Sequence, residues 1–408
     1  MYQIGQATTG VLDLPYDFTY NQAYDGDELA TGVVIGSDLT INGNGKTICG
    51  NELARVFKVS NDATLTLKDV TICHGAADQG AGVFVDAGAT LKAEDTTFTL
   101  NTATTKGGAI YSEGTVDLKD SVIKENYISK RDGAGDENKG GAALYNKGGT
   151  ATLDNVTVVD NLKDYVNGDV LNGAVVAMGK TTITNSNFTN NYGRYGGAIT
   201  QTETDETLTV ENTIFEDNYA IFGGAIYDSG APLVVKDSKF YNNSGVGPGS
   251  AGTSSSQGGA ILVMGENAGL DLKGSDFINN TADLGGAVAV SSGTTGTFAI
   301  DDCTFTENKA NDEGGAIYGY TTDSPITVSN SEFTKNNGGS YGGAIEADGN
   351  TDLNVIDSKF TQNSASYGGA IITGGNTVIS GSTFTGNDAA SLTEAIYSWY
   401  SGKTLALT

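Results

Sequence analysis

The chain is poor in basic residues, and this limits its partners. Its 408 residues include 22 Lys and Arg against 49 Asp and Glu, which gives a formal net charge of -27 at pH 7. Nucleic acids are bound through Lys and Arg at the phosphates, and anionic membrane surfaces attract basic segments. The composition therefore excludes nucleic acid as a partner. It is typical of a self-repelling extracellular protein that needs no cofactor and binds Ca²⁺ only weakly.

Long apolar runs and histidine are also scarce. No stretch approaches the ~20 consecutive apolar residues that span a bilayer, so we expect no membrane insertion. The single histidine of the chain is His74. It directly follows Cys73 in a predicted turn, and we interpret it as a surface residue rather than as a catalyst.

What the chain contains instead is a repeat of about 24 to 30 residues, which is typical of a solenoid. In its first half, an apolar residue is followed three positions later by Asn, except that Gly75 follows Ile72. We predict that the apolar side chains stack inside as a column and that the Asn side chains form a ladder at the turn. The apolar position is held by Ile48, Ile72, Phe98, Ile123, Val158, Phe188, Phe215, Phe240, Phe277, Phe305, Phe333, Phe360 and Phe384.

The second half of the repeat reads Gly-Gly-Ala followed by Ile, Leu or Val, as in residues 223–226 and 342–345. Paired glycines indicate a sharp bend where neighbouring coils approach closely. A third short apolar segment, such as residues 208–210, completes each coil. Three short strands per coil, paired in parallel with right-handed connections, predict an all-β right-handed parallel β-helix of about thirteen coils.

The repeat also sets the predicted domain boundaries. Residues 1–32 do not match it, and we expect them to form an N-terminal cap or docking segment, because an open end would expose strand edges. Residues 33–408 are predicted to form one β-helix repeat domain.

These motifs resemble two groups of surface proteins. The Gly-Gly-Ala-[Ile/Leu/Val] and Phe-x-x-Asn motifs are similar to the repeats of chlamydial polymorphic outer-membrane proteins. Residues 36–59 resemble the first coil of adhesin-like proteins of methanogenic archaea, which have a similar Thr-Ile-x-Gly-Asn-Gly segment. The resemblance covers about residues 30–408 and implies a secreted, surface-displayed, adhesive protein.

Cysteine is rare, and the repeat position of each of the three suggests its state. Cys49 and Cys73 occupy the same position in adjacent coils, at a spacing compatible with a disulfide. Two unpaired thiols are the alternative. Cys303 stands where other coils have an inward Ser or Thr, so we expect a buried free thiol.

Aromatic residues gather at one predicted corner, just before the paired glycines. Stacked along that corner, they would offer a platform for sugar rings or for side chains of a partner; the alternative is that they only cover the corner. The candidate residues are Tyr192, Tyr195, Tyr219, Phe222, Tyr341 and Tyr367.

The sequence offers little support for catalysis. Right-handed β-helices also include polysaccharide lyases and glycoside hydrolases, which need a base beside calcium-binding carboxylates or paired aspartates with a histidine. Asp301 and Asp302 match pieces of such sites, but His74 is far away along the repeat. We therefore expect no catalytic residues, no metal site and no enzymatic activity.

The leading hypothesis is a non-enzymatic, cell-surface adhesin that binds an extracellular glycan or a cell-surface protein. A first alternative is a structural subunit that assembles head to tail into filaments through open β-edges. Its docking residues would be Trp399, Tyr400, Leu405 and Leu407, which follow the last full repeat. The second alternative is a polysaccharide lyase or glycoside hydrolase on the same scaffold.

Overall fold

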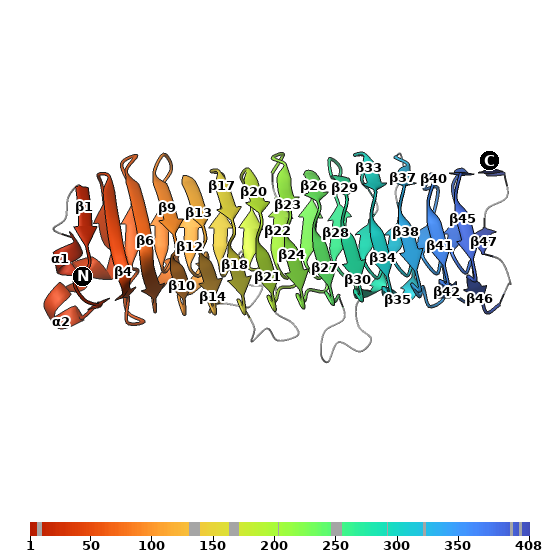
Figure 1. Ribbon diagram of the computed structural model, residues 1–408. Coiled ribbons are helices and arrows are strands. Elements are labelled where there is room, and N and C mark those ends of the chain that lie inside the picture. Colours follow the sequence, from red (N-terminus) through yellow and green to blue (C-terminus); the bar gives the residue numbers. More distant parts are fainter. Residues whose placement is uncertain are drawn as a thin grey trace. The chain divides into compact units, whose positions relative to one another are not determined.

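The computed structural model (Figure 1) describes residues 1–5, 10–129, 139–162, 171–202, 204–245, 255–291, 293–320, 324–391, 395–399 and 402–408. Within these ranges, helical structure is confined to α1 (Tyr2–Gly5), α2 (Gln22–Asp25) and the 3-10 helix η1 (Asp27–Thr31). None of the described helices has the length and hydrophobicity that crossing a membrane requires. The chain divides into two compact units: residues 1–193 with 198–200, and residues 194–197 with 201–408.

In the first unit, short strands pair in parallel from coil to coil and form three columns. The first column contains β1 (Gly10–Asp13), β4 (Leu39–Cys49), β6 (Thr64–Cys73), β9 (Thr90–Glu94), β13 (Thr115–Lys119), β17 (Ala151–Asp154) and β20 (Thr181–Thr184). The second contains β2 (Phe18–Thr19), the ends of β4 and β6, β10 (Thr97–Thr99), β14 (Val122–Lys124), β18 (Thr157–Val159) and β21 (Asn187–Thr189). The third contains β3 (Val33–Ile35), β5 (Phe57–Val59), β8 (Val83–Val85), β12 (Ile110–Ser112), β16 (Leu144–Asn146) and β19 (Val175–Ala177). A small sheet at the turn contains β7 (Ala76–Gln79), β11 (Thr102–Lys106) and β15 (Tyr127–Ile128).

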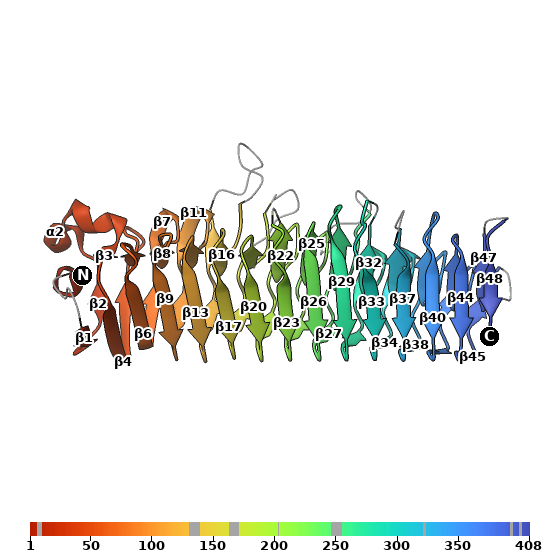
Figure 2. The same ribbon diagram turned by 90° about the horizontal axis from the view of Figure 1, so that it is seen from above.

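The second unit has the same three columns, and Figure 2 shows β23, β26 and β29 of its first column side by side. The first column contains β23 (Leu208–Glu211), β26 (Pro232–Lys236), β29 (Gly269–Lys273), β33 (Phe298–Asp301), β37 (Ile326–Ser329), β40 (Leu353–Ile356), β44 (Thr377–Ser380) and β48 (Leu405–Leu407). The second contains β24 (Ile214–Glu216), β27 (Lys239–Tyr241), β30 (Asp276–Ile278), β34 (Thr304–Thr306), β38 (Glu332–Thr334), β41 (Lys359–Thr361) and β45 (Thr383–Thr385). The third contains β25 (Ile226–Ser229), β28 (Ile261–Met264), β32 (Val288–Val290), β36 (Ile317–Gly319), β39 (Ile345–Ala347), β43 (Ile371–Thr373) and β47 (Ile396–Ser398).

Short strands at the turn of the second unit are β31 (Thr281–Leu284), β35 (Lys309–Glu313), β42 (Ser364–Ala365) and β46 (Asp388–Ala389). The strand β22 (Ile199–Thr202) lies where the chain passes between the two units. Counted over both units, the strands make about 13 turns of a parallel β-solenoid. The prediction of an all-β right-handed parallel β-helix of about thirteen coils is confirmed.

The apolar column of the repeat is the core of each unit. In the second unit, the centroids of successive rings from Phe215 to Phe384 are 4.6 to 4.9 Å apart, and their planes are within 9° of parallel. In the first unit, Ile48, Ile72 and Phe98 lie in register and are fully buried. Because strand residues i and i+2 share a face, the repeat period alone aligns these side chains. The predicted column is confirmed.

The Asn residues form the predicted ladder at the end of the second column. The Asn308 Nδ2 donates to Oδ1 of Asn336 (3.0 Å) and to the carbonyl oxygen of Phe277 (2.9 Å). The Asn308 Oδ1 accepts from the backbone N–H of Asn280 (3.0 Å) and from its Nδ2 (2.9 Å). Where Asn is missing, the Gly75 N–H still donates to Oδ1 of Asn101. Each buried amide thus satisfies the polar groups of its neighbouring coils.

The paired glycines make the bend before the third column. Gly342 has φ of +60°, and a Cβ there would lie 2.4 Å from the carbonyl oxygen of Ile345. A Cβ on Gly343 would lie 2.0 Å from the carbonyl oxygen of Gly369 in the next coil. Both positions therefore require glycine, the first for its left-handed backbone and the second for the close approach of coils.

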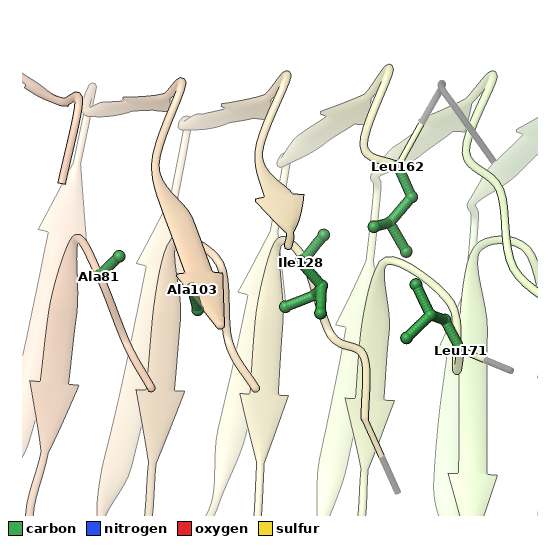
Figure 3. Close-up of a cluster of buried hydrophobic side chains, with 6 residues drawn as sticks. Ala81, Ala103, Ile128, Leu162 and Leu171 are labelled. Atoms are coloured by element: carbon green, nitrogen blue, oxygen red, sulfur yellow. The ribbon is translucent and has the colours of Figure 1, made fainter. Parts of the chain in front are cut away.

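The corner before this bend buries its own small apolar cluster in the first unit. Figure 3 shows Ala81, Ala103, Ile128, Leu162 and Leu171 gathered along this corner, and all are fully buried. Because this cluster closes the coil interior between the second and third columns, the corner is part of the core rather than a loop.

Residues 1–32 contribute strands to the solenoid. The strands β1 and β2 both pair with β4, and Phe18 lies in register with Ile48 as a buried extension of the apolar column. The Tyr20 hydroxyl donates to the carbonyl oxygen of Gly26 (3.0 Å) and ties down the following helical turns. The role of this segment as a cap or docking element stays a prediction.

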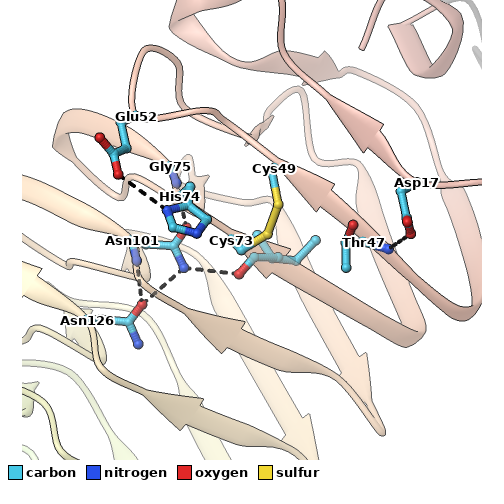
Figure 4. Close-up of a disulfide and its surroundings, with 10 residues drawn as sticks. Asp17, Thr47, Cys49, Glu52, Cys73, His74, Gly75, Asn101 and Asn126 are labelled. Atoms are coloured by element: carbon cyan, nitrogen blue, oxygen red, sulfur yellow. Dashed lines mark hydrogen bonds and ion pairs between the residues drawn. A yellow bond between two sulfur atoms is a disulfide. The ribbon is translucent and has the colours of Figure 1, made fainter.

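The cysteines lie where the repeat places them (Figure 4). Cys49 and Cys73 are in register between β4 and β6, with Cα atoms 4.5 Å apart and their sulfurs joined as a disulfide. Beside them, His74 Nδ1 lies 3.5 Å from a carboxylate oxygen of Glu52. Cys303 is a buried free thiol, and burial raises its pKa to about 12.

Candidate active site

The predicted aromatic corner corresponds to a row of residues directly before the paired glycines of each coil, which we call the pre-glycine row. In the second unit, isolated bridges join Tyr195 to Phe222 and Tyr341 to Tyr367 between neighbouring coils. The rings of the first pair are 5.4 Å apart and those of the second pair 5.5 Å apart, both stacked. These two pairs therefore lie together along the corner.

The other two candidates of that corner are placed differently. Tyr192, in the first unit, packs against the buried cluster of Ala81 and its neighbours. Tyr219, in the second unit, is buried, with 9% of its surface exposed. Both rings contribute to packing, and neither is a member of the pre-glycine row.

The outer face of the third column carries a second row of side chains. In each coil the residue after Gly-Gly-Ala-[Ile/Leu/Val] points outward, because its neighbours on both sides point into the core. This outward row contains Tyr227, Leu262, Ala289, Tyr318, Glu346, Ile372 and Tyr397, which are in register from coil to coil. Phe222 and Leu284 of the pre-glycine row pack over its centre. Glu346 is the charged member of this otherwise uncharged row.

Three carboxylates meet around Glu346. Oxygens of Glu313, Glu346 and Asp348 all lie within 4.8 Å of one another. Glu313 ends β35 in the pre-glycine row, Glu346 is in the outward row, and Asp348 follows two residues later on the same side of the strand. Glu346 is 1% exposed, whereas Glu313 and Asp348 are partly exposed. The three residues form an acidic cluster with Glu346 as its buried member, which we call the carboxylate site.

Burial and mutual repulsion hold protons in this site. Burial, reinforced by Asp312 and Asp348, raises the pKa of Glu313 to about 7, while a hydrogen bond from Tyr318 opposes the rise. Burial, reinforced by Glu313, Asp348 and Asp312, raises the pKa of Glu346 to about 9. Burial and the same acidic neighbours raise the pKa of Tyr318 as well, so its hydroxyl stays a hydrogen-bond donor. Near neutral pH, Glu346 is protonated and Glu313 exchanges its proton readily.

The carboxylate site also fits a hard cation. The buried Oε2 of Glu346 has no hydrogen-bond partner among the described residues. Three carboxylates within reach of one another are the oxygen ligands that Ca²⁺ prefers. A proton or a cation would each relieve the cost of burying this group, and the two compete for the same oxygens.

This site was not among the residues predicted from the sequence, although the repeat contained a signal for it. Glu346 follows Gly-Gly-Ala-Ile at a position where other coils have Tyr, Leu, Ala or Ile. Glu313 precedes Gly-Gly-Ala at the position where Tyr341 and Tyr367 stand in the next two coils. Charged residues in two otherwise uncharged columns of the same region are the pattern that points to a site. The expectation of no metal-ligand cluster was based on the spacing of residues in the sequence. The coiling of the chain brings together carboxylates that are far apart in that sequence.

The predicted end-docking residues that the structure describes lie in two different places. The Trp399 ring lies 4.8 Å from the Tyr341 ring and 6.2 Å from that of Tyr397, so it belongs to the aromatic corner. Leu405 and Leu407 are in β48, which pairs with β44, and they are 39% and 62% exposed. Tyr400 lies outside the described residues. Docking through these residues stays a prediction.

Comparison with known proteins identifies the family. Residues 55–277 and 142–342 match the model of a family described as the right handed beta helix region. The matches span more than half of the chain, so the chain belongs to this family. No curated protein matches the chain in sequence. The resemblance to chlamydial and archaeal surface proteins therefore stays a prediction.

Two solved structures are similar to the chain. One is a mannuronic acid specific polysaccharide family 6 lyase from human gut microbiota, with a TM-score of 0.36, 10% identity and coverage of 98% of this chain and 77% of that chain. The other is a PL6 family polysaccharide lyase from Pseudopedobacter saltans, with a TM-score of 0.32, 13% identity and coverage of 96% and 91%.

These comparisons correct the functional expectation. The leading hypothesis of a non-enzymatic adhesin, and the expectation of no enzyme, are contradicted because the similar solved structures are polysaccharide-cleaving enzymes. At 10% and 13% identity the likeness extends to the fold alone. An activity of this chain therefore has to be argued from its own residues.

Proposed function

We propose that the chain cleaves polysaccharides at the carboxylate site, with Glu313 as the catalytic acid and base. The observation that carries this proposal is that the partly exposed carboxylates of Glu313 and Asp348 lie within 4.8 Å of each other in an acidic cluster. Glycoside hydrolases use two such carboxylates, one of which holds a proton near neutral pH. Glu313 matches the acid of the pair, because its pKa is about 7.

The proposed reaction is hydrolysis of a glycosidic bond. Glu313 donates its proton to the leaving oxygen, and a carboxylate oxygen of Asp348 bonds to the anomeric carbon as the glycosidic bond breaks. Glu313 then takes a proton from water, whose oxygen displaces Asp348 and restores both carboxyl groups. The separation of these groups is closer to the ~5 Å of retaining enzymes than to the ~6.5–9.5 Å of inverting ones. Retention of configuration is therefore part of the proposal.

Two further residues position this acid. The Tyr318 hydroxyl is hydrogen-bonded to Glu313 and restricts its rotamer. Glu346 is protonated beside Glu313 and Asp348, so it adds no negative charge but helps to hold the two other carboxyl groups in place. Both are positioning residues, because the buried Glu346 and Tyr318 lie under the groups that reach the substrate.

A second candidate is calcium-dependent elimination on a uronate polymer. It is favoured by the unpartnered Oε2 of Glu346, which a Ca²⁺ ion shared with Glu313 and Asp348 would satisfy. The ion would neutralise the uronate carboxylate and offset the repulsion between the acidic protein and an acidic substrate. We rank hydrolysis first, because it requires no added ion to bring substrate and protein together.

We place this activity outside the cell. The proposal is supported by the Cys49–Cys73 disulfide, because such bonds persist mainly in oxidising compartments.

The test is a panel of neutral polysaccharides (β-glucan, xylan, mannan, galactan) and polyuronates (alginate, polygalacturonate), each assayed with Ca²⁺ and with a chelator. Reducing ends without ultraviolet absorbance indicate hydrolysis, and an unsaturated product indicates elimination. Glu313→Gln should lower kcat by roughly 10²–10⁴, the usual value of a general acid. The matched control is Glu266→Gln, which changes an exposed glutamate far along the chain. Equal activity of Glu313→Gln and the parent, or no product from any substrate, would reject the proposal.

A further inference from the structure

We infer that Tyr341, Tyr367, Tyr397 and Trp399 form a sugar-binding platform for neutral polysaccharide, beside the carboxylate site. The inference rests on the proposed function, because it assigns these rings to the substrate of that site. It concerns the second unit alone, where all four rings and the three carboxylates lie.

The backbone places the platform in line with the catalytic acid. Glu313, Tyr341 and Tyr367 are successive members of the pre-glycine row and are joined by parallel bridges from coil to coil. Neighbouring coils are ~4.8 Å apart, which is about the length of one sugar residue in a polysaccharide. A chain that follows the row from Glu313 therefore places consecutive sugars over Tyr341 and Tyr367.

The rings form one continuous surface. Tyr341 contacts Tyr367, with centroids 5.5 Å apart, and Trp399, at 4.8 Å. Tyr397, the outward-row residue two coils after Glu346, contacts both Tyr367 and Trp399 at 6.2 Å. The Trp399 side chain is 38% exposed, and the three tyrosines are partly exposed. Tyr341 and Tyr367 stack on each other, whereas Trp399 and Tyr397 are tilted by 44° and 41° to them. We assign stacking against the apolar face of a sugar to the tilted rings, and contact through the exposed ring edges to Tyr341 and Tyr367.

The charges around the rings select the kind of sugar. Burial raises the pKa of Tyr341, and it is raised further by Tyr367, Asp312, Glu346 and Glu313, so acidic side chains lie around this ring. An anionic sugar on this platform would be repelled by these acidic groups. Neutral sugars avoid this repulsion, so the platform should prefer them over uronates.

The test measures binding without turnover. In a Glu313→Gln background, isothermal titration would use β-1,4-linked gluco-, xylo- and manno-oligosaccharides of increasing length, with oligouronates from alginate as the charged comparison. At least one neutral series should bind more tightly as it lengthens, and oligouronates should bind more weakly. Tyr341→Ala and Trp399→Ala should each weaken binding of the longer oligomers about tenfold, equivalent to about 1.4 kcal/mol.

Matched variants separate stacking from folding. Tyr341→Phe keeps the ring and should bind as the parent does. Phe222→Ala removes a ring from the pre-glycine row three coils before Glu313. This variant should leave the binding of short oligomers unchanged. Equal thermal unfolding of all variants shows that the fold is intact; where Tyr341→Ala unfolds early, Tyr367→Ala and Trp399→Ala take its place.

The outcomes distinguish the platform from the proposed activity. Unchanged binding in both alanine variants, tighter binding of oligouronates, or no binding of any neutral oligomer would overturn the platform. Loss of cleavage in Glu313→Gln together with unchanged binding in the alanine variants would leave the activity standing without the platform. Binding that depends on the rings, in a protein that cleaves no substrate, would support the platform and reject the proposed activity.

Discussion

Glu346 shows how one residue in a repeat can acquire special chemistry. Its strand position differs in no way from that of Ile372 in the next coil, with which it is in register. Both side chains point outward and are covered by neighbouring residues. An isoleucine is stabilised by this environment, whereas a carboxylate is desolvated and keeps its proton. The local backbone is the same, and the chemistry of the side chain alone makes the site.

This burial makes the stability of the second unit depend on pH. The pKa of Glu346 is raised by burial from its ordinary value of 4.5 to about 9 in the folded state. Below the ordinary value both folded and unfolded chains hold the proton. Above it the unfolded chain ionises while the folded chain does not, so stability falls as pH rises toward about 9. Glu346→Gln should remove this dependence and raise the unfolding temperature at alkaline pH.

Thermal unfolding in the presence of a chelator, at several values between pH 5 and pH 9, would measure this effect. The exposed Glu266→Gln serves as the control and should follow the parent at every pH. A parent and a Glu346→Gln variant that lose stability in parallel toward pH 9 would show that Glu346 is already ionised when folded.

Much of the core could be predicted residue by residue, and the site could not. Phe277 and Asn308 keep their places because a column of like residues requires only a regular period and strand alternation. The grouping of Glu313 with Glu346 depends on how two outward side chains from different coils lean over a bend. The spacing of these residues in the sequence, 33 positions apart by number, carries no such information. A search for charges within otherwise apolar columns would have found Glu346.

At the scale of strands, the stacked rings of the second column should behave as one unit. Phe277 is fully buried between Phe240 and Phe305, at ring distances of 4.6 and 4.9 Å. Phe277→Ala removes both contacts and leaves a cavity that the rigid coils above and below cannot fill. We expect a loss of ~3–5 kcal/mol in the free energy of unfolding, measured by urea denaturation. Lys309→Ala, at an exposed position in β35, should unfold like the parent.

The disulfide joins two adjacent strands of the first unit. Cys49 and Cys73 are separated by 24 residues and link β4 to β6. A loop of this length restricts the unfolded chain, so Cys49→Ser with Cys73→Ser should lose ~3 kcal/mol of stability. Reduction of the parent should reproduce the loss, whereas Cys303→Ser leaves the disulfide intact. The prediction fails if reduced and oxidised parent proteins unfold at the same denaturant concentration.

At the scale of the whole molecule, the repeat determined the fold more directly than any single residue. Each coil is too small to bury its own apolar face, so stacking is the stable arrangement, and the motif order indicated it. The structure added β1 and β2, where Phe18 extends the column from within residues first assigned outside the repeat. The strand β2 begins a Phe-x-x-Asn motif, Phe18 to Asn21, so the repeat could have been extended to it from the sequence. The strand β1 carries no such motif, and its parallel pairing with β4 places it in the first column.

The net charge of -27 is a property of the whole chain, and it opposes folding through self-repulsion. Exposed ion pairs such as Lys273 with Asp301 and Lys359 with Glu332 compensate little of it, because surface pairs are weak. The Debye length falls from about 30 Å at 0.01 M salt to about 3 Å at 1 M, so added NaCl should screen the repulsion and raise the unfolding temperature. An uncharged osmolyte at equal osmolality controls for effects other than screening.

Divalent cations would separate screening from binding at the carboxylate site. At equal ionic strength, MgCl2 and CaCl2 screen the distributed charge to a similar extent, whereas Ca²⁺ tolerates the irregular geometry of three carboxylates better than Mg²⁺ does. A larger rise in unfolding temperature with CaCl2, absent in Glu346→Gln, would therefore place an ion on Glu313, Glu346 and Asp348 and favour the elimination mechanism. If MgCl2 and CaCl2 raise the unfolding temperature equally, and do so in Glu346→Gln as well, the carboxylate site holds a proton rather than an ion. This result would favour hydrolysis. An unfolding temperature that stays constant or falls with every salt would contradict the role given to net charge.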